Sequence, residues 1–295
     1  MLGSFMMDLI TQAPRRPERG ETLIGTGFAQ HLGGKGLNQA VAAARSGADV
    51  HMIGAVGDDE YGAQFLDRLG AEGIDATHVM TTGRGTGVGL PLVEPNGENS
   101  IVVVPRANLA VTPEDVRAAE AAFATADLLL LQQELPLDSI REAARIAHEA
   151  GTSVMLNPAP ALEGTRDMRG LVDILVPNEY EARTLSGDGE GTAEALGKAL
   201  LEDWSLAQVV LTLGSAGALV VDRDGATTVR PHVVEAIDTI GAGDTFCGTL
   251  AARLACGEPF ADAAAYANVA AAISVTRTGG ADAVPMHEAV LAALG

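Results

Sequence analysis

The stretch Ile237-Asp238-Thr239-Ile240-Gly241-Ala242-Gly243-Asp244-Thr245-Phe246 leads into an Ala-rich apolar segment, which predicts a helix over 242–256. Its three small residues let the backbone turn tightly where the first N–H groups of the helix lack intrahelical partners and the dipole is positive. Such a helix start binds anions. We expect the carboxylate of Asp244 to stay ionised there and to accept a proton from a bound hydroxyl. The simpler alternative is that Asp244 is an N-cap and the glycines are turn residues.

The composition limits the classes of partner. The chain has 295 residues, of which 47% are hydrophobic, so it can bury a large core in one or two domains. Its net charge of −20 argues against nucleic acid and anionic membranes, and any bound anion needs a local positive site. Cys247 and Cys256 fall on opposite faces of the predicted helix, which predicts neither a disulfide nor a metal site and favours a reducing cytoplasm. No segment has the ~20 apolar residues of a membrane span.

Apolar segments alternate with helical ones along most of the chain. This order predicts a parallel sheet that is covered on both faces. The apolar start at residues 1–4 lies almost on a strand, and we expect further residues of that strand upstream. Strands are predicted at 22–30, 50–56, 88–93, 100–104, 127–131, 153–156, 171–176, 208–213, 218–221 and 227–229, and helices at 37–46, 138–150, 192–203, 242–256 and 259–276, with two more capped by Asp58-Asp59 and by the capping box Thr112-Pro113-Glu114-Asp115.

The early β segments predict a second, smaller sheet. Pro95-Asn96-Gly97-Glu98 is a hairpin signal between two of them, and we expect them to form a lid. Elsewhere, polar residues follow the predicted strands, and in open α/β sheets ligands bind beyond the carboxyl ends of the strands. Each residue by itself is better explained as a cap or a turn, but caps and turns alone do not explain why so many strands end in polar residues. These residues are Asp8, Glu134, Asn157, Asn178, Glu181 and Thr212.

A second glycine-rich turn, Gly33-Gly34-Lys35-Gly36-Leu37-Asn38, contains one of only two lysines. The alternative interpretation is a surface lysine in a turn. The Walker A pattern GxxxxGK[ST] is absent, which excludes a P-loop enzyme. A dinucleotide fingerprint is also absent, because Phe246 stands where the last glycine of GxGxxG belongs, so a nicotinamide dehydrogenase is disfavoured.

The chain resembles the ribokinase family of carbohydrate kinases from Gly3 to about Pro285. GGKGLNQAVAAARSGADV, GDDEYG and DTIGAGDTFCG carry the resemblance, and NPAPAL, VPNEYEA and TLGSAGA follow in the family's order. It implies an α/β fold, a three-layer α/β/α sandwich with a mostly parallel central sheet and a small β lid. Residues 1–295 are then one catalytic domain, with the lid formed by about 9–35 and 86–108.

The same resemblance implies transfer of the γ-phosphoryl group of ATP to O5 of ribose, with Mg²⁺ and a monovalent cation, typically K⁺, as cofactors. Asp244 is then the base, and the turn Gly241, Ala242 and Gly243 supplies the anion hole with it. The implied sugar contacts are Met6, Asp8, Gly34, Lys35, Gly36, Asn38, Glu134 and Asp244; the ATP contacts are Asn178, Thr212, Gly214, Ser215, Gly217, Gly243 and Asn268. Asn178 and Glu181 help to place Mg²⁺, and the K⁺ loop comprises Asp238, Ile240, Ser274, Arg277, Gly279 and Ala283. A homodimer that pairs its lids is also implied.

One departure bears on the substrate. Met6 stands two residues before Asp8, where many ribokinases have Asn, and a thioether cannot hydrogen-bond a sugar hydroxyl as an amide does. We therefore hypothesise that 2-deoxyribose is accepted or preferred, because a missing hydroxyl strands no polar partner there. Deoxyribokinase, fructokinase, nucleoside kinase and ketodeoxygluconate kinase remain alternatives within the family, and a non-catalytic sugar-binding module is an alternative outside catalysis. Arg106 also departs from the family pattern and has no assigned role.

Overall fold

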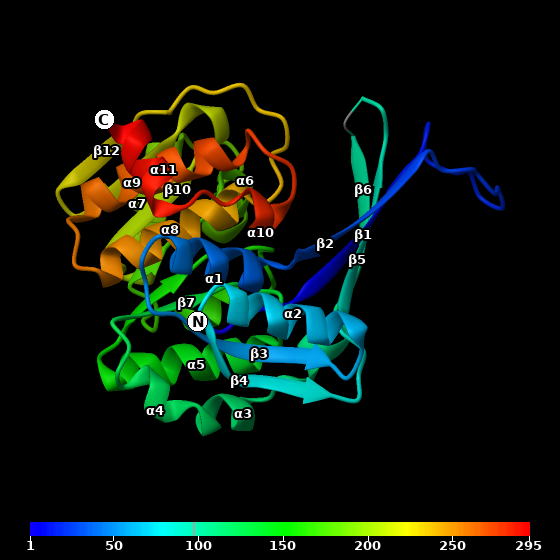
Figure 1. Ribbon diagram of the computed structural model, residues 1–295. Helices are drawn as coiled ribbons and strands as arrows, with labels where there is room; N and C mark the ends of the chain where they lie inside the picture. The colour runs from blue at the N-terminus through cyan, green and yellow to red at the C-terminus, as the bar shows by residue number, and fades with distance from the viewer. Residues whose placement is uncertain (97) are drawn as a thin grey trace.

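The computed structural model describes residues 1–96 and 98–295, which form a body with one projecting arm (Figure 1). The strands are β1 (Met6–Gln12), β2 (Gly27–Gly33), β3 (His51–Gly57), β4 (Asp75–Thr82), β5 (Gly87–Val93), β6 (Asn99–Val104), β7 (Leu128–Leu131), β8 (Ser153–Leu156), β9 (Ile174–Leu175), β10 (Gln208–Thr212), β11 (Ala218–Asp222) and β12 (Gly225–Val229). The α-helices are α1 (Lys35–Arg45), α2 (Glu60–Ala71), α3 (Pro113–Ala118), α4 (Glu120–Phe123), α5 (Leu137–Ala150), α6 (Glu179–Ser186), α7 (Ala193–Trp204), α8 (Ala242–Ala255), α9 (Phe260–Ser274), α10 (Gly280–Ala283) and α11 (His287–Leu294).

The body is built on a mostly parallel sheet, as the sequence predicts. Strands β7 to β10 run parallel in chain order, and β11 and β12 extend that sheet as an antiparallel hairpin. The parallel pair β3–β4 joins it through Leu2, which forms parallel bridges with Ile53 of β3 and Leu131 of β7. The first residues of the chain therefore sit in the centre of the sheet.

Helices cover both faces of this sheet, which makes three layers. Leu129 and Leu131 of β7 point into a core shared with α3 to α7, whereas Leu130 points to the opposite core with α8 and α9. A third cluster packs α1 and α2 against β3 on the same side as α8. Because both faces of β7 are buried, its sequence is four consecutive leucines rather than an alternating pattern.

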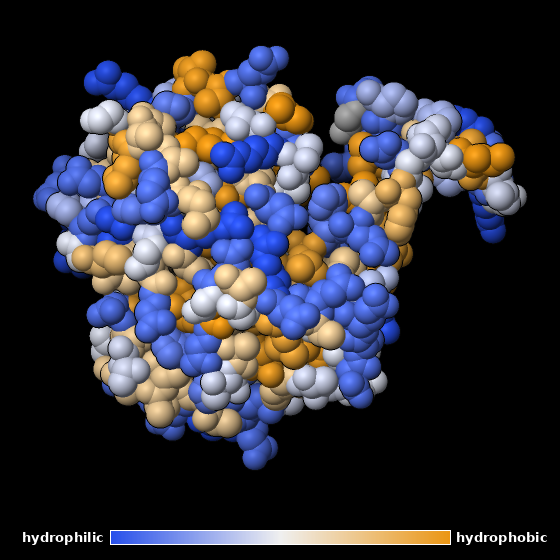
Figure 2. Space-filling view, viewed as in Figure 1, coloured by the Kyte–Doolittle hydropathy of each residue, from blue (hydrophilic) through white to orange (hydrophobic). Residues whose placement is uncertain are grey.

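The arm is a separate four-stranded sheet with the order β2-β1-β5-β6. β1 pairs antiparallel with β2 and parallel with β5, so Asp8 lies opposite His31 on one side and Gly89 on the other. Large apolar side chains are exposed on this sheet, and Figure 2 shows them as orange atoms along the arm. They include Phe28, Leu90, Ile101, Val102, Val103 and Val104.

Most predicted elements are confirmed, three predictions need correction, and several elements were not predicted. Asp8 lies inside β1 of the arm and does not follow a strand of the central sheet, because the chain leaves that sheet after residue 3. The predicted strand 22–30 is shifted to β2, and 171–176 contains only the two-residue β9. Strands β1 and β4 and helices α6, α10 and α11 were not predicted. The predicted turn at 95–98 includes Gly97, which lies outside the described residues.

Across the described ranges 1–96 and 98–295, the helices are all too short or too polar to cross a bilayer.

Candidate active site

The first turn of α8 presents free backbone donors. Gly241 is the N-cap with φ 75°, and a Cβ there would come within 3.0 Å of the Gly280 Cα atom, so only glycine fits. Thr245 N–H donates to Gly241 O at 2.8 Å, and Ala242 N–H donates to Thr239 O at 3.3 Å. Among residues 1–96 and 98–295, no protein acceptor receives the N–H of Gly243 or Asp244. The start of α8 thus offers two backbone donors to an anion, with Ala242 engaged elsewhere.

The carboxylate of Asp244 is buried at this turn, with 7% of the residue exposed. Helix α1 packs along α8 and brings two side-chain amides to it. Asn38 Nδ2 donates to Oδ2 at 3.0 Å, and Gln39 Nε2 donates to Oδ1 at 2.9 Å. Both oxygens therefore have an amide donor, and the orientation of the carboxylate is fixed from the α1 side.

The start of α1 is braced by Ser4 and Glu134. Lys35 N–H donates to Glu134 Oε2 at 2.9 Å, and Gly36 N–H donates to Ser4 Oγ at 3.2 Å. A Cβ on Gly36 would lie 2.2 Å from the backbone N of Ser4, so glycine is required for this close approach. The pKa of Lys35 is raised, mainly by the negative charge of the nearby Asp244 carboxylate. The turn therefore holds a cation close to the start of α8.

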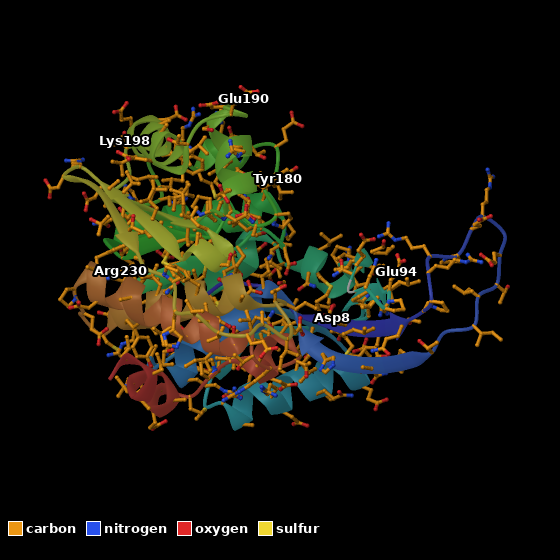
Figure 3. The ribbon with its side chains drawn as sticks, turned by 90° about the horizontal axis from the view of Figure 1, so that it is seen from above. Asp8, Glu94, Tyr180, Glu190, Lys198 and Arg230 are labelled. Atoms are coloured by element: carbon orange, nitrogen blue, oxygen red, sulfur yellow. The ribbon has the colours of Figure 1, made fainter. Side chains whose placement is uncertain are left out.

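Asp8 lies at the root of the arm, where it meets the body (Figure 3). A Cβ on Gly33 or on Gly89 would come within 2.3 Å of an Asp8 carboxylate oxygen, so these two glycines let the carboxylate lie flat on the sheet. Met6 shares that face, because its Cγ would lie 3.7 Å from a Cβ on Gly89. Burial and the nearby Glu134 raise the pKa of Asp8 to about 6. Asp8, Met6 and Glu134 thus gather at the junction of arm and body.

A polar cavity of about 220 Å³ opens in front of Asp244. Asn178 and Glu181 line it and form a reciprocal capping box at the start of α6, with both hydrogen bonds at 2.8 Å. Burial raises the pKa of Glu181, and it also raises that of the Cys247 thiol on the same wall. Lys35 faces these groups from α1.

A second, more apolar cavity of about 410 Å³ adjoins the first. Thr212 and Gly243 line both cavities, so a ligand can extend from one into the other. Asn268 closes the second cavity and is held by a hydrogen bond from its Nδ2 to Arg230 O at 2.8 Å. Gly214, Ser215 and Gly217, which the sequence predicts to contact ATP, also line it.

The loop before α8 is tied to the loop before α10 by Asp238. Its Oδ1 accepts from Ile240 N–H at 3.0 Å, and its Oδ2 accepts from Gly279 N–H at 3.1 Å. Ile237 N–H also donates to Val275 O at 2.7 Å. The predicted cation-loop residues from 238–240 and 274–283 are therefore brought together next to Gly241.

A family model described as pfkB family carbohydrate kinase matches residues 1–286. The chain belongs to this family. It is 38% identical over 294 residues to a ribokinase of Haemophilus influenzae, covering 99% of this chain and 96% of that protein. It is 36% identical over 292 residues to a deoxyribokinase of Salmonella typhimurium, covering 98% and 95%. A structure of Arabidopsis thaliana ribokinase complexed with ribose and ATP superposes with a TM-score of 0.89 at 28% identity, covering 99% and 97%.

These similarities confirm the family, the three-layer fold and the enzyme class predicted from the sequence, a carbohydrate kinase. Within the site, the contacts show one participant that sequence reasoning missed. Gln39 stands next to Asn38 in the motif, and its only sequence signal was an amide inside an Ala-rich apolar helix. Lys198, the other lysine, lies far from Asp8 in Figure 3 and pairs with Glu194 at 2.7 Å.

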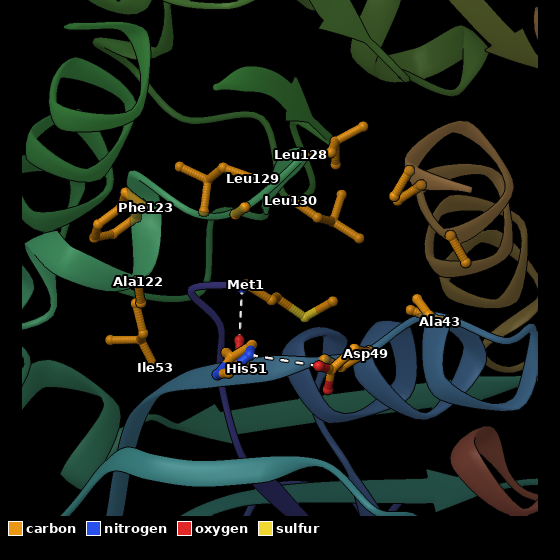
Figure 4. A pocket seen from close by; sticks show the side chains of 16 residues that line it. Met1, Ala43, Asp49, His51, Ile53, Ala122, Phe123, Leu128, Leu129 and Leu130 are labelled. Carbon is orange, nitrogen blue, oxygen red and sulfur yellow. Dashed lines mark hydrogen bonds and ion pairs between the residues drawn. The ribbon is translucent and has the colours of Figure 1, made fainter. Parts of the chain in front are cut away.

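This kinase also has a small apolar cavity of about 90 Å³ away from the predicted site residues. Figure 4 shows it between β3 and β7, beside Met1, whose amino group donates to His51 O at 2.7 Å. Leu129, Phe123 and Ile53 line its walls. It lies within the central sheet next to the bridge at Leu2, and its lining is apolar apart from Asp49 and His51.

Proposed function

We propose that the chain transfers the γ-phosphoryl group of ATP to O5 of D-ribose, with 2-deoxy-D-ribose accepted or preferred as the alternative acceptor. One observation carries the proposal. At the start of α8, the two backbone donors that lack a protein acceptor within 1–96 and 98–295 stand beside a buried carboxylate, and both Gly243 and Asp244 line the same cavity. A base next to an anion site is what transfer to an alcohol requires.

In this proposal Asp244 takes the proton of the sugar hydroxyl while the hydroxyl oxygen forms a bond to the γ-phosphorus. The bond between the γ-phosphorus and the bridging oxygen breaks, and ADP leaves with its electron pair. The N–H groups of Gly243 and Asp244 donate to the oxygens of the transferring group, where negative charge must be stabilised. Lys35 adds positive charge from α1. The purine and ribose of ATP occupy the larger cavity bounded by Thr212 and Asn268.

The residues around the polar cavity fit an Mg²⁺ ion that is coordinated mainly by the phosphate oxygens of ATP. In the described part of the chain, no group of three or more His, Cys, Asp or Glu side chains could hold a metal directly. Mg²⁺ usually keeps several waters and binds through one or two carboxylates and phosphate oxygens. Asn178 and Glu181 therefore serve as acceptors for its waters, and the bound ion neutralises phosphate charge.

The loop at Asp238 fits a monovalent cation, for which backbone and carboxylate oxygens are suitable ligands. Asp238 braces the two segments that would supply them, Ile240 on one side and the 274–283 region on the other. The residues proposed to hold K⁺ are Asp238, Ile240, Ser274, Arg277, Gly279 and Ala283. Held there, the cation would increase the positive field at the adjoining helix start.

The arm is proposed to act as a lid over the sugar. Asp8 and Met6 on the arm, and Gly34, Lys35, Gly36, Asn38 and Glu134 on the body, supply the sugar contacts. The buried thioether of Met6 offers no hydrogen bond, which favours a sugar that lacks one hydroxyl. The similarity to a deoxyribokinase supports this second candidate substrate.

A homodimer formed through the arms is also proposed. β6 is an edge strand on which four consecutive residues, Ile101 to Val104, are exposed by 40–62%. An apolar unpaired edge favours pairing with another chain. We propose a reducing cytoplasm as the location, where the two free cysteines stay reduced.

The test is sugar-dependent release of ADP, with ribose, 2-deoxyribose, fructose and a nucleoside as acceptors, in the presence and absence of K⁺. We expect turnover with one or both pentoses. Binding of a sugar without release of ADP would instead identify a sugar-binding module, and turnover with only fructose or a nucleoside would identify another kinase of the family.

A further inference from the structure

Gln39 contacts the carboxylate of Asp244 but lines neither of the two cavities. The residue is fully buried in α1. Its Nε2 donates to Asp244 Oδ1 at 2.9 Å and to Asn157 Oδ1 at 3.1 Å. Gln39 can therefore act on a reaction in the cavity only through the two lining residues that it holds, Asp244 and Asn157.

A chain of buried amides fixes which end of Gln39 faces Asp244. Gln132, at the end of β7, donates from Nε2 to Gln39 Oε1 at 2.7 Å. Asn157, after β8, accepts from Gln39 and donates from Nδ2 to Val176 O at 2.8 Å. An amide has one accepting and one donating end, so the donor from Gln132 turns the NH₂ group of Gln39 toward the carboxylate. Only one set of amide orientations satisfies all of these bonds.

Two donors act on Asp244 with different effects on its geometry. The bond from Asn38 holds only Oδ2, so by itself it restrains rotation about the Cβ–Cγ bond less than two bonds do. The bond from Gln39 to Oδ1 adds a second fixed point, so the plane of the carboxylate is set. A carboxylate has about four lone-pair sites, and those not used by the amides are then held toward the cavity.

We propose that Gln39 is a positioning residue for phosphoryl transfer, which orients the base Asp244 through the amide chain Gln132–Gln39–Asn157. The inference rests on the proposed function, because it assigns Gln39 a role only if Asp244 takes a proton. Positioned groups lose efficiency steeply with small displacements, and a misplacement of about 1 Å costs about 100-fold in rate. The effect belongs in kcat, since Gln39 touches neither ATP nor sugar in the proposed complex.

The first test compares Gln39→Leu with Gln133→Leu. Gln133 is a matched control, because it is also buried and donates from Nε2 to Thr165 Oγ1 at 2.9 Å, with no bond to Asp244. We expect Gln39→Leu to lower kcat by about 10- to 100-fold while the KM for ATP stays within about 2-fold. Gln133→Leu should lower the melting temperature about as much as Gln39→Leu does, but its kcat should stay within about 2-fold of the wild-type value. Equal losses of kcat in the two variants, or wild-type kcat in Gln39→Leu, would overturn the proposal.

A second variant decides the question if Gln39→Leu does not fold. Gln39→Glu keeps the shape but places a carboxylate beside Asp244, among the other ionisable groups of the cavity wall, Lys35, Glu181 and Cys247. Two adjacent carboxylates can share one proton at low pH but repel each other when both ionise. We expect kcat of Gln39→Glu to fall as the pH rises across a range in which the wild-type kcat is flat. A profile parallel to that of the wild type would refute the positioning role.

The two levels of proposal fail in different ways. If the wild-type chain releases no ADP with any acceptor, the proposed function fails and the role of Gln39 falls with it. If wild-type turnover depends on Asp244 but is insensitive to Gln39→Leu and Gln39→Glu, only the positioning role is wrong.

Discussion

Asp8→Asn is expected to make the ligand-free protein more stable at neutral and alkaline pH. In the folded protein, burial and the neighbouring Glu134 raise the pKa of Asp8 from 3.8 to about 6. A carboxyl group with a raised pKa in the folded state binds its proton more tightly there than in the unfolded chain. It therefore costs no stability below pH 3.8, and the cost grows as the pH rises until it is complete above about pH 6. The amide that the substitution introduces does not ionise and avoids this cost.

The magnitude follows from the size of the shift. A change of about 2 units corresponds to about 3 kcal/mol in the free energy of unfolding, which is an upper limit. Asp8 is partly exposed and coupled to Glu134, so solvent screening reduces the gain to about 1–2 kcal/mol. For a chain of 295 residues, the entropy of unfolding is about 0.6 kcal/mol/K, so the melting temperature should rise by about 2–3 °C.

The assay is thermal melting of the two proteins at pH 8 and pH 4.5, without sugar or ATP. We expect the gain at pH 4.5 to be about one third of the gain at pH 8, because most of the penalty is absent there. Asp224→Asn, in an exposed turn, is the control and should shift neither melting temperature. Asp8→Asn should also raise the KM for ribose, since the carboxylate is a proposed sugar contact. A gain that is equal at both pH values, or a loss at pH 8, would show that the reasoning about burial is wrong.

Four further predictions test the base, the sugar contact, a backbone packing and the arm. Asp244→Asn should leave ATP binding intact and lower kcat by at least ~100-fold, and ADP release at the wild-type rate would remove it from the mechanism. Met6→Asn should raise the ratio of kcat/KM for ribose over 2-deoxyribose by about 2- to 10-fold; an unchanged ratio contradicts the role of the thioether. Gly36→Ala should lower the free energy of unfolding by about 1–3 kcal/mol, since its Cβ meets the backbone of Ser4. Gly70→Ala, in open space on α2, should stabilise the protein, and melting curves that rank the two variants in the opposite order would refute this. Val102→Lys should convert a dimer into monomers in light scattering, and a dimer that persists would place the interface elsewhere.

The sequence predicted the local parts of this fold. The capping box at Thr112, the helix from residue 242 and the hairpin strands of the arm depend on residues within a few positions of one another. Strand β4 was missed although Thr77, Val79 and Thr81 carry an alternating β-branched pattern. Helix α6 was missed because its eight residues are too few for a clear helical period.

For the candidate site, the motifs identified the residue types, but the partners came from packing. Asn38 and Asp244 were both predicted from the sequence, whereas their hydrogen bond joins residues 206 positions apart. Asp8 was expected beyond the end of a central strand, and only the topology places it within the arm, between two glycines. No local propensity states which sheet a short strand will join, because β pairing is stabilised by contacts distant in sequence.

By itself, the sequence determined the chemical possibilities of this protein. Gly241, required at positive φ, and the aspartate three residues later set a helix start with free backbone donors beside a carboxylate, because backbone conformation and capping are decided locally. Only the tertiary structure decided how that carboxylate is held. Gln39 hydrogen-bonds this carboxylate although the two residues are 205 positions apart in sequence. The packing of α1 against α8 brings the buried amide to a buried acceptor that needs a hydrogen-bond donor.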